Sequence, residues 1–151
     1  MFKKTLLFLI LNFSALAIGS IFTNSGVSSD WYQNLSKAPW TPPGWVFGVA
    51  WSSIMFFFAI YMAYLVKLKQ KKGILILYSI QWILNITWNP IFFYLHEILF
   101  GLICISILTV LIAVLFFKFW KEQKTKTLLL APYAIWLIIA TSLNAYIFLY
   151  N

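Results

Sequence analysis

The stretch "ILFGLICISILTVLIAVLFFKF", residues 98–119, decides the fold class. It runs for 20 residues before its first charged side chain, Lys118. A helix of about 20 apolar residues crosses the roughly 30 Å hydrocarbon core of a bilayer. Four similar stretches accompany it, so the sequence predicts spans at about residues 5–23, 45–66, 73–94, 98–119 and 128–150. We therefore expect an all-α fold, an integral membrane bundle of five transmembrane helices that occupies residues 1–151 as a single transmembrane domain.

The charge pattern supports the same number of spans and predicts their direction. All eleven cationic residues are lysines, and ten of them lie before the first span, between the second and third, or from the end of the fourth, at Lys118, to the start of the fifth. Short loops rich in lysine face the cytoplasm, so the N-terminus is expected inside and the C-terminus outside. The net charge of +8 is then a consequence of topology, with some attraction to anionic membrane lipid, and no nucleic-acid partner is expected.

The beginning of the chain has two explanations. The run "MFKKTLLFLILNFSALA" has a basic start, an apolar centre and an Ala-x-Ala ending at Ala17, which is typical of a secretory signal peptide. Cleavage would leave four spans with the same loops on the same sides. Hydrophobicity continues through Ile21 and Phe22, however, which favours a retained first span.

The first outer loop, residues 24–44, is about twenty residues long, and loops of that length are usually functional or disordered. It begins with the polar run "TNSGVSSD" and continues as "WYQNLSKAPWTPPGW". Pro39, Pro42 and Pro43 fix their own backbone angles and disfavour helix in the residues before them. The segment is therefore predicted to be an ordered, extended lid.

Three of the spans each carry one face rich in aromatic and amide side chains. Their members recur three or four residues apart, which is the spacing of a single helix face. The three stripes are Phe47, Trp51, Ile54 and Phe58; Gln81, Asn85, Trp88 and Phe92; and Tyr133, Trp136, Ala140 and Asn144.

Amide side chains are costly to expose to lipid, so the amides of these stripes should point into the bundle. Interhelical hydrogen bonds alone would explain them, and so would a binding site. Tryptophan often anchors a helix at the membrane interface, but Trp51, Trp88 and Trp136 fall a turn or two inside their spans. A separate stripe of small residues, Ala15, Gly19 and Thr23, fits either close packing within the bundle or a homodimer contact.

The sequence offers little material for acid–base, nucleophilic or metal chemistry. It has one histidine, one cysteine and three carboxylates, from which no metal-ligand cluster or catalytic triad can be assembled. We expect no metal and no cofactor. An aromatic interior with a few amides and a proline-stiffened lid instead indicates a pocket for a flat, largely apolar ligand.

Three motifs resemble those of one known family. They are "WYQNLSKAPWTPPGWVFGVAW" at residues 31–51, "QWILNITWNPIFF" at 81–93 and "APYAIWLIIATSLNAY" at 131–146. Together with five spans, they resemble the TspO/MBR family of tryptophan-rich sensory proteins and translocator proteins, formerly called the peripheral benzodiazepine receptor. The resemblance covers essentially the whole chain.

The resemblance implies a five-helix membrane receptor, sensor or carrier that often dimerises. Such a protein binds tetrapyrroles, among them protoporphyrin IX and haem, as well as isoquinoline carboxamide and benzodiazepine drugs. In bacteria the family is linked to porphyrin-dependent stress responses. By motif position, the resemblance implies a pocket roofed by the lid and walled by the spans, with the ligand-binding residues Tyr32, Pro42, Pro43, Trp51, Asn85, Trp88, Trp136, Ala140 and Leu143.

Two other functions stay open. Some members of the family promote light- and oxygen-dependent breakdown of protoporphyrin IX, and the matching catalytic residues are Trp51 and Trp136, with Tyr32 nearby. A structural membrane scaffold is the third possible function.

Animal members of the family have a C-terminal cholesterol motif that needs a basic residue after a tyrosine, and "NAYIFLYN" has none. This departure points to a protein of the bacterial cell membrane without a steroidogenic role.

Overall fold

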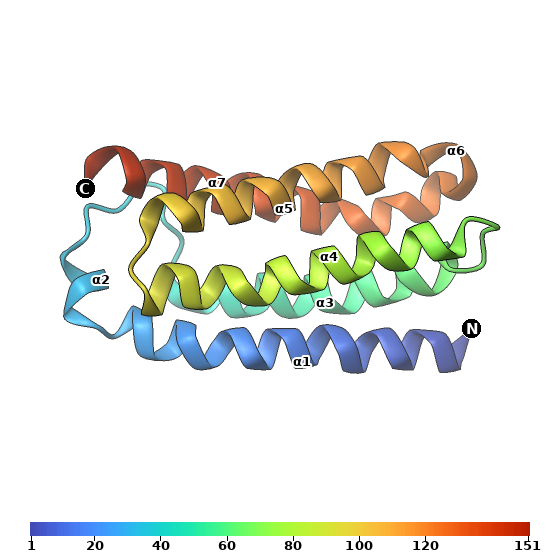
Figure 1. Ribbon diagram of the computed structural model, residues 1–151, viewed down its shortest axis with the longest axis horizontal. Coiled ribbons are helices and arrows are strands. Elements are labelled where there is room, and N and C mark those ends of the chain that lie inside the picture. The colour runs from blue at the N-terminus through green and yellow to red at the C-terminus, as the bar shows by residue number, and fades with distance from the viewer.

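The protein is a bundle of five long helices without any β-strand. The computed structural model describes all residues from 1 to 151. Each long helix is long and apolar enough to cross a membrane, and together they form an elongated bundle (Figure 1). They are α1 (Phe2–Val27), α3 (Gly44–Leu65), α4 (Lys71–Asn89), α5 (Ile98–Lys118) and α7 (Ala131–Tyr150). The prediction of an all-α membrane bundle with five spans is confirmed.

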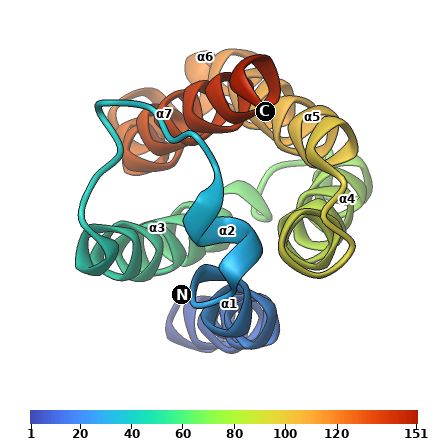
Figure 2. The same ribbon diagram turned by 90° about the vertical axis from the view of Figure 1, so that its left-hand side faces the viewer.

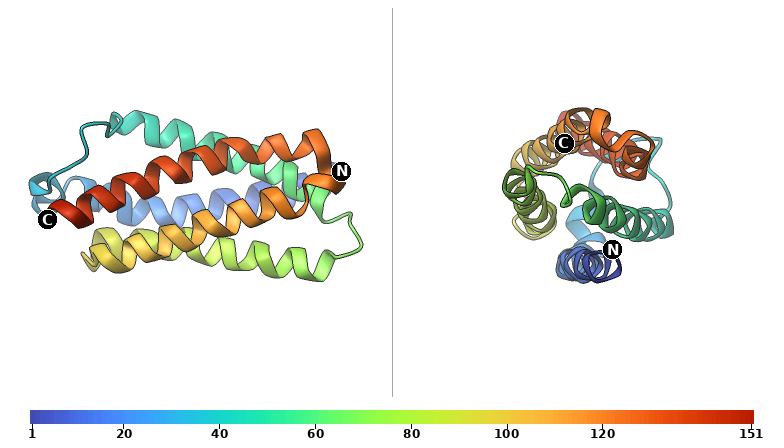
Figure 3. Two further views of the ribbon diagram at one scale, coloured as in Figure 1. Left: turned by 90° about the horizontal axis from the view of Figure 1, so that it is seen from above. Right: turned by 90° about the vertical axis from the view of Figure 1, so that its right-hand side faces the viewer.

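The helices form a closed ring in the order α1, α3, α7, α5 and α4 when the bundle is viewed along its length (Figure 2). The contacts of α5 with α7 and of α1 with α3 are the most extensive, and the contact of α3 with α7 is the least. The N-terminus and the lysine-rich connections lie at one end of the bundle, here called the lysine-rich end (Figures 1 and 3). The C-terminus and the first outer loop lie at the other, here called the lid end.

The lid, defined here as residues 28–43, crosses the lid end of the bundle (Figure 2). It contains a short helix, α2 (Asp30–Asn34), whose first turn is capped by the Ser29 hydroxyl, which accepts the Tyr32 backbone N–H at 3.2 Å. The prediction of an extended segment is therefore wrong for residues 24–27, which continue α1, and for α2. Residues 35–43, which hold the prolines, are not helical.

The third span ends in a wider turn that the sequence pattern did not predict. Proline has no backbone N–H and crowds the carbonyl four residues earlier, so it disturbs an α-helix. After Pro90 the chain forms a π-helix, η1 (Pro90–Tyr94), closed by the Leu95 N–H donating to the Pro90 carbonyl at 2.9 Å. The turn buries the consecutive residues Phe92 and Phe93, which are 2% and 8% exposed.

The last span is preceded by two short helices at the lysine-rich end. These are α6 (Trp120–Gln123) and the 3₁₀-helix η2 (Lys124–Leu130). They lead the chain from α5 back into α7 and place Leu130 in the core, fully buried.

Buried polar side chains join the helices in the centre of the bundle. The Asn12 amide donates to the Met55 carbonyl at 3.0 Å, and the Tyr78 hydroxyl donates to Asn12 Oδ1 at 2.7 Å. The Gln81 amide donates to the Tyr133 hydroxyl at 2.7 Å. Hydrogen bonds between membrane helices contribute about 0.6 kcal/mol on average, so their main effect is to fix which faces meet.

The small residues of α1 pack within the bundle. A Cβ at Gly19 would lie 2.6 Å from Asn89 Nδ2, and the Thr23 hydroxyl donates to Asn89 Oδ1 at 2.6 Å. Further along, a Cβ at Gly26 would overlap the side chain of Phe93. Small side chains here allow α1 to approach the end of the third span, so packing within the bundle accounts for the stripe.

The close approach at Gly26 gives a stability prediction. Gly26→Ala should destabilise the protein by about 1–3 kcal/mol, because Phe93 must move away from the added methyl group. Gly48→Ala is the matched control, since a Cβ there meets nothing within 4 Å and alanine is the better helix former by up to about 1 kcal/mol. Thermal unfolding in detergent measures both. Equal or higher stability of Gly26→Ala would contradict the packing described.

Candidate ligand-binding cavity

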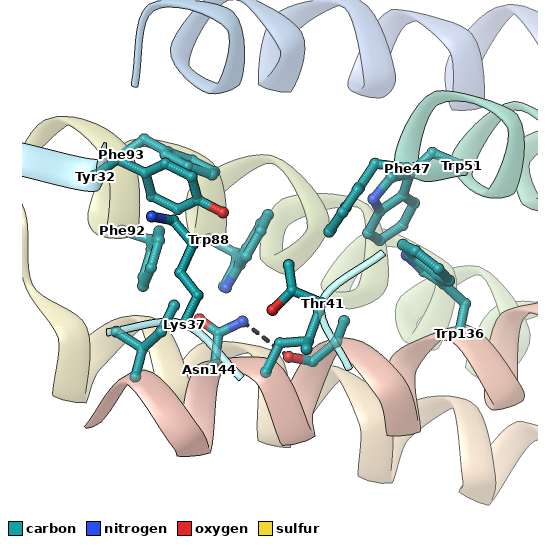
Figure 4. Close-up of a pocket in the computed structure, with 13 residues that line it drawn as sticks. Tyr32, Lys37, Thr41, Phe47, Trp51, Trp88, Phe92, Phe93, Trp136 and Asn144 are labelled. Atoms are coloured by element: carbon teal, nitrogen blue, oxygen red, sulfur yellow. Dashed lines mark hydrogen bonds between the residues drawn. The ribbon is translucent and has the colours of Figure 1, made fainter. Parts of the chain in front are cut away.

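A cavity lies at the lid end of the bundle, enclosed by the lid, α3, the end of the third span and α7 (Figure 4). Ten of its 13 lining residues are hydrophobic. The lid contributes Tyr32, Lys37 and Thr41; α3 contributes Phe47 and Trp51; α4 and η1 contribute Trp88, Phe92 and Phe93; and α7 contributes Trp136, Ala140, Leu143, Asn144 and Ile147.

Six of the nine residues expected at the pocket line this cavity, namely Tyr32, Trp51, Trp88, Trp136, Ala140 and Leu143. The other three do not line it. Pro42 and Pro43 set the course of the lid, and Thr41 is the neighbour that reaches the cavity, in a turn closed by its hydroxyl donating to the Ala38 carbonyl at 2.7 Å. Asn85 is buried one helix turn before Trp88, in the direction of the lysine-rich end.

Aromatic contacts hold the lid closed. The Trp31 ring stacks on His96 with the ring centroids 4.1 Å apart, and it meets the edge of Phe92 at 5.6 Å. Tyr32 packs against Phe93 at 5.5 Å. The pairs Trp31–Phe92 and Tyr32–Phe93 together contribute about 1–3 kcal/mol beyond the burial of their area, so the lid is held by contacts that can be broken reversibly.

The middle and end of the lid are attached to the last span. The Trp40 indole N–H donates to the Ser142 hydroxyl at 3.1 Å. The Asn151 side chain accepts the Ser36 backbone N–H at 2.8 Å and donates to the Ser36 carbonyl at 3.2 Å. These contacts bring the C-terminal turn of α7 against the lid.

Lys37 is the one charged side chain that lines the cavity. Its ammonium group donates to the Gln33 and Leu35 carbonyls at 3.2 and 3.4 Å and lies 4.7 Å from the centroid of the Tyr32 ring. Burial raises the pKa of the Tyr32 hydroxyl above its usual value, so this hydroxyl stays neutral at physiological pH. The mouth of the cavity therefore carries a single positive charge.

Three buried polar atoms on the cavity wall have no hydrogen-bond partner. They are the indole nitrogens of Trp88 and Trp136 and the Oδ1 oxygen of Asn144, whose amide nitrogen donates to the Ala140 carbonyl at 2.9 Å. Figure 4 draws the nitrogen of Trp88 on the ring edge that faces the cavity. Only two other buried side-chain atoms, on Gln81 and Thr127, are without partners. A buried unpaired polar group costs about 1–3 kcal/mol, so the cavity holds two donors and one acceptor that a ligand can satisfy.

The wall also offers flat surfaces. Trp88 and Phe92 are nearly parallel, with an interplanar angle of 12°. Phe47 meets Trp136 edge to face at 5.3 Å, and Trp51 meets Tyr133 in the same way at 6.1 Å. Such rings stack on planar ligands.

The cavity is narrow, with a volume of about 40 Å³. Ligand pockets for small molecules usually measure about 300–1,000 Å³. A planar ligand of that size therefore requires the lid and its aromatic neighbours to move outward.

Lys37, Phe93 and Ile147 line the cavity but were not among the residues expected there, and Thr41 was expected only as part of the segment from Pro39 to Pro43. The sequence did mark Lys37 as unusual, because it is the only lysine between Lys4 and Lys67 and so stands alone in an outer loop. Phe93 follows directly on Phe92 and falls outside the spacing of three or four residues that defines the stripe, so the pattern did not select it.

Similarity to known proteins agrees with this arrangement. The chain matches the TspO/MBR family over residues 7–150. It belongs to that family. Members are integral membrane proteins, and the five apolar helices of this chain place it in a membrane as well.

Three relatives illustrate the breadth of the family. Protein CrtK of Rhodobacter capsulatus is 32% identical over 132 residues, which is 85% of this chain and 80% of that protein. The tryptophan-rich sensory protein of Cereibacter sphaeroides is 31% identical over 115 residues, or 76% of this chain and 73% of that protein. The human translocator protein is 32% identical over 134 residues, or 84% of this chain and 78% of that protein.

Cleavage by trypsin after Lys37 provides a direct test of lid closure. Lys37 is the only residue of the outer loops after which trypsin cleaves. The next residue, Ala38, is 4% exposed, so the closed lid should protect this peptide bond. Trp31→Ala removes the contacts with His96 and Phe92 and should raise the cleavage rate about tenfold, since it removes roughly 1.4 kcal/mol of attachment. The two fragments are quantified on a gel. Trp45→Ala is the control, because Trp45 is 71% exposed. Equal rates in both variants would show that Trp31 does not hold the lid.

Proposed function

We propose that the protein is a membrane receptor, sensor or carrier that binds tetrapyrroles such as protoporphyrin IX and haem in the cavity at the lid end. The observation that carries this proposal is the set of unpartnered polar atoms, Trp88 Nε1, Trp136 Nε1 and Asn144 Oδ1, on the wall of an aromatic cavity. The same cavity is proposed to accept isoquinoline carboxamide and benzodiazepine drugs. Membership of a family of tryptophan-rich sensory and translocator proteins supports a receptor or sensor role.

The chemistry of a tetrapyrrole complements this wall. Its macrocycle is flat and largely apolar, which suits the parallel rings of Trp88 and Phe92. Its propionate groups accept hydrogen bonds, which suits the indole N–H groups and the Lys37 ammonium. Hydrogen bonds to a charged partner contribute about 1.5–3 kcal/mol each. Drugs of the isoquinoline carboxamide class have the same combination of planar rings and a carbonyl acceptor.

The lysine pattern supports the proposed orientation, with the N-terminus in the cytoplasm and the cavity opening on the outer side of a bacterial cell membrane. A rigid lid lowers the entropy lost when it closes over a ligand. The prolines of residues 39–43 supply that rigidity.

The binding test uses substitutions that keep the aromatic ring and remove the N–H donor. Trp88→Phe and Trp136→Phe should each weaken protoporphyrin IX binding about tenfold or more, because each loses a hydrogen bond to a charged acceptor. Titration in the dark is followed by the absorbance of the porphyrin, which does not depend on the number of tryptophans left. Trp120→Phe, in α6 at the lysine-rich end, is the matched control.

The outcomes separate the candidate functions. Saturable binding that neither substitution weakens would place the tetrapyrrole outside this cavity. Absence of saturable binding to the wild type would leave a structural scaffold as the function that fits best.

A second candidate function is light-dependent degradation of protoporphyrin IX. It is favoured by the position of Trp51 and Trp136, which both line the cavity, with Tyr32 in the lid above them. Tryptophan and tyrosine are readily oxidised, and illuminated porphyrin with dissolved oxygen supplies the oxidising power. No metal is needed for these residues to donate electrons.

Illumination of the bound complex in air tests this activity. The wild type should form a product with a distinct absorption spectrum, and the variant carrying both Trp51→Phe and Trp136→Phe should form at least tenfold less at equal porphyrin occupancy. Free tryptophan at the same concentration is the control. The same product at the same rate in that control would mean that the porphyrin destroys itself without catalysis by the protein.

A further inference from the structure

A second hollow lies on the flank of the bundle, between α3 and α7. These two have the least extensive contact of any neighbouring pair of long helices. Ala50, Ser53 and Ile54 of α3 form one side of this groove, and Ala131, Pro132 and Ile135 of α7 form the other. It is open, and its volume is about 440 Å³. Trp136 belongs to the wall of both the groove and the ligand cavity, so its indole ring separates the two.

Two lysines lie beside Tyr64 of α3, nearer the lysine-rich end than the groove. Tyr64 lies on the face of α3 that carries the groove residue Ser53. Ser53 and Tyr64 are eleven residues apart, which is close to three helical turns and places them on one face. The Lys67 and Lys126 ammonium groups lie 5.5 and 4.6 Å from the centroid of the Tyr64 ring. Both lysines are exposed, and neither forms a salt bridge. Glu122 lies four residues before Lys126 but forms no salt bridge with either lysine, so the cluster keeps a net positive charge.

The separation of the lysine cluster from the groove matches the dimensions of one leaflet. Eleven residues of α-helix rise about 16 Å, and half of the hydrocarbon core measures about 15 Å. A lipid whose phosphate lies at Lys67 and Lys126 therefore reaches the groove at Ser53 with the far part of an acyl chain.

We propose that this face of α3 binds one anionic phospholipid of the membrane. Its phosphate lies between Lys67 and Lys126 beside Tyr64, and one acyl chain runs along α3 into the groove and ends against Trp136. The unpaired lysines select the negative headgroup, at about 1 kcal/mol for each lysine near the surface. The mostly apolar groove holds the chain. Because Trp136 is shared, the bound chain supports the back wall of the ligand cavity.

The headgroup is tested by native mass spectrometry of the detergent-solubilised protein with phosphatidylglycerol and phosphatidylcholine. The wild type should retain one phosphatidylglycerol in preference to phosphatidylcholine, and Lys67→Gln/Lys126→Gln should reduce that preference roughly 30-fold. Lys69→Gln/Lys121→Gln is the control, because it removes the same charge from neighbouring exposed positions. An equal loss in both variants would show a diffuse effect of charge and overturn the proposal.

The chain is tested with phosphatidylglycerol brominated at the end of its acyl chains, since bromine quenches nearby tryptophan fluorescence. Quenching should fall when Trp136→Phe removes the indole at the groove and when Ser53→Leu fills the groove, while Trp120→Phe should keep the fractional quenching of the remaining tryptophans. Unchanged quenching in both groove variants would overturn the placement of the chain.

Other occupants give distinct results. Displacement of phosphatidylglycerol by glycerol phosphate or inorganic phosphate at equal concentration would mean that the lysines bind free phosphate, and it would contradict a lipid site. A change of oligomeric state in Ser53→Leu, measured by light scattering, would identify the groove as a contact between copies of the chain and would also contradict the proposal.

Discussion

Aromatic packing between the lid and the π-helical turn at the end of the third span is the contact on which the cavity depends. Pro90 disturbs the α-helix, and the wider turn η1 then buries both Phe92 and Phe93. Trp31 and Tyr32 close onto these rings, and Gly26 leaves space for Phe93 against α1. Both phenylalanines of this turn pack against the lid, and they support the roof of the cavity.

Polar side chains have different roles along the length of the bundle. Near its centre, Asn12, Tyr78, Gln81 and Tyr133 bond to one another or to backbone, and so they fix how α1, α3, α4 and α7 face each other. At the lid end, the polar atoms of Trp88, Trp136 and Asn144 have no partner. Natural structures satisfy nearly all buried polar groups, so a local group of exceptions indicates a functional site. The small volume of the cavity, about 40 Å³, indicates that the site widens before it binds a ligand.

The sequence was sufficient to predict the features that depend on helical periodicity and on the thickness of the membrane. Five spans follow from hydrophobic length, and Trp51, Trp88, Trp136, Ala140 and Leu143 meet at one cavity, as their motif positions and the helical stripes suggested. The lid was less predictable. Proline fixes backbone angles but does not say which neighbour turns inward, so Pro42 and Pro43 were singled out for the cavity and Thr41 was not. Helix α2 had a signal in Ser29 followed by Asp30, which are typical of a helix start.

The indole N–H groups of Trp88 and Trp136 have no hydrogen-bond partner in the structure, and we propose that a flat, acidic ligand supplies one. The most direct measurement is the NMR spectrum of the tryptophan side-chain N–H groups in ¹⁵N-labelled protein, titrated with protoporphyrin IX in the dark. We expect the signals of Trp88 and Trp136 to shift to lower field and to exchange more slowly with water when the ligand binds, while that of Trp120 stays unchanged. Saturable binding that leaves both signals in place would contradict this proposal.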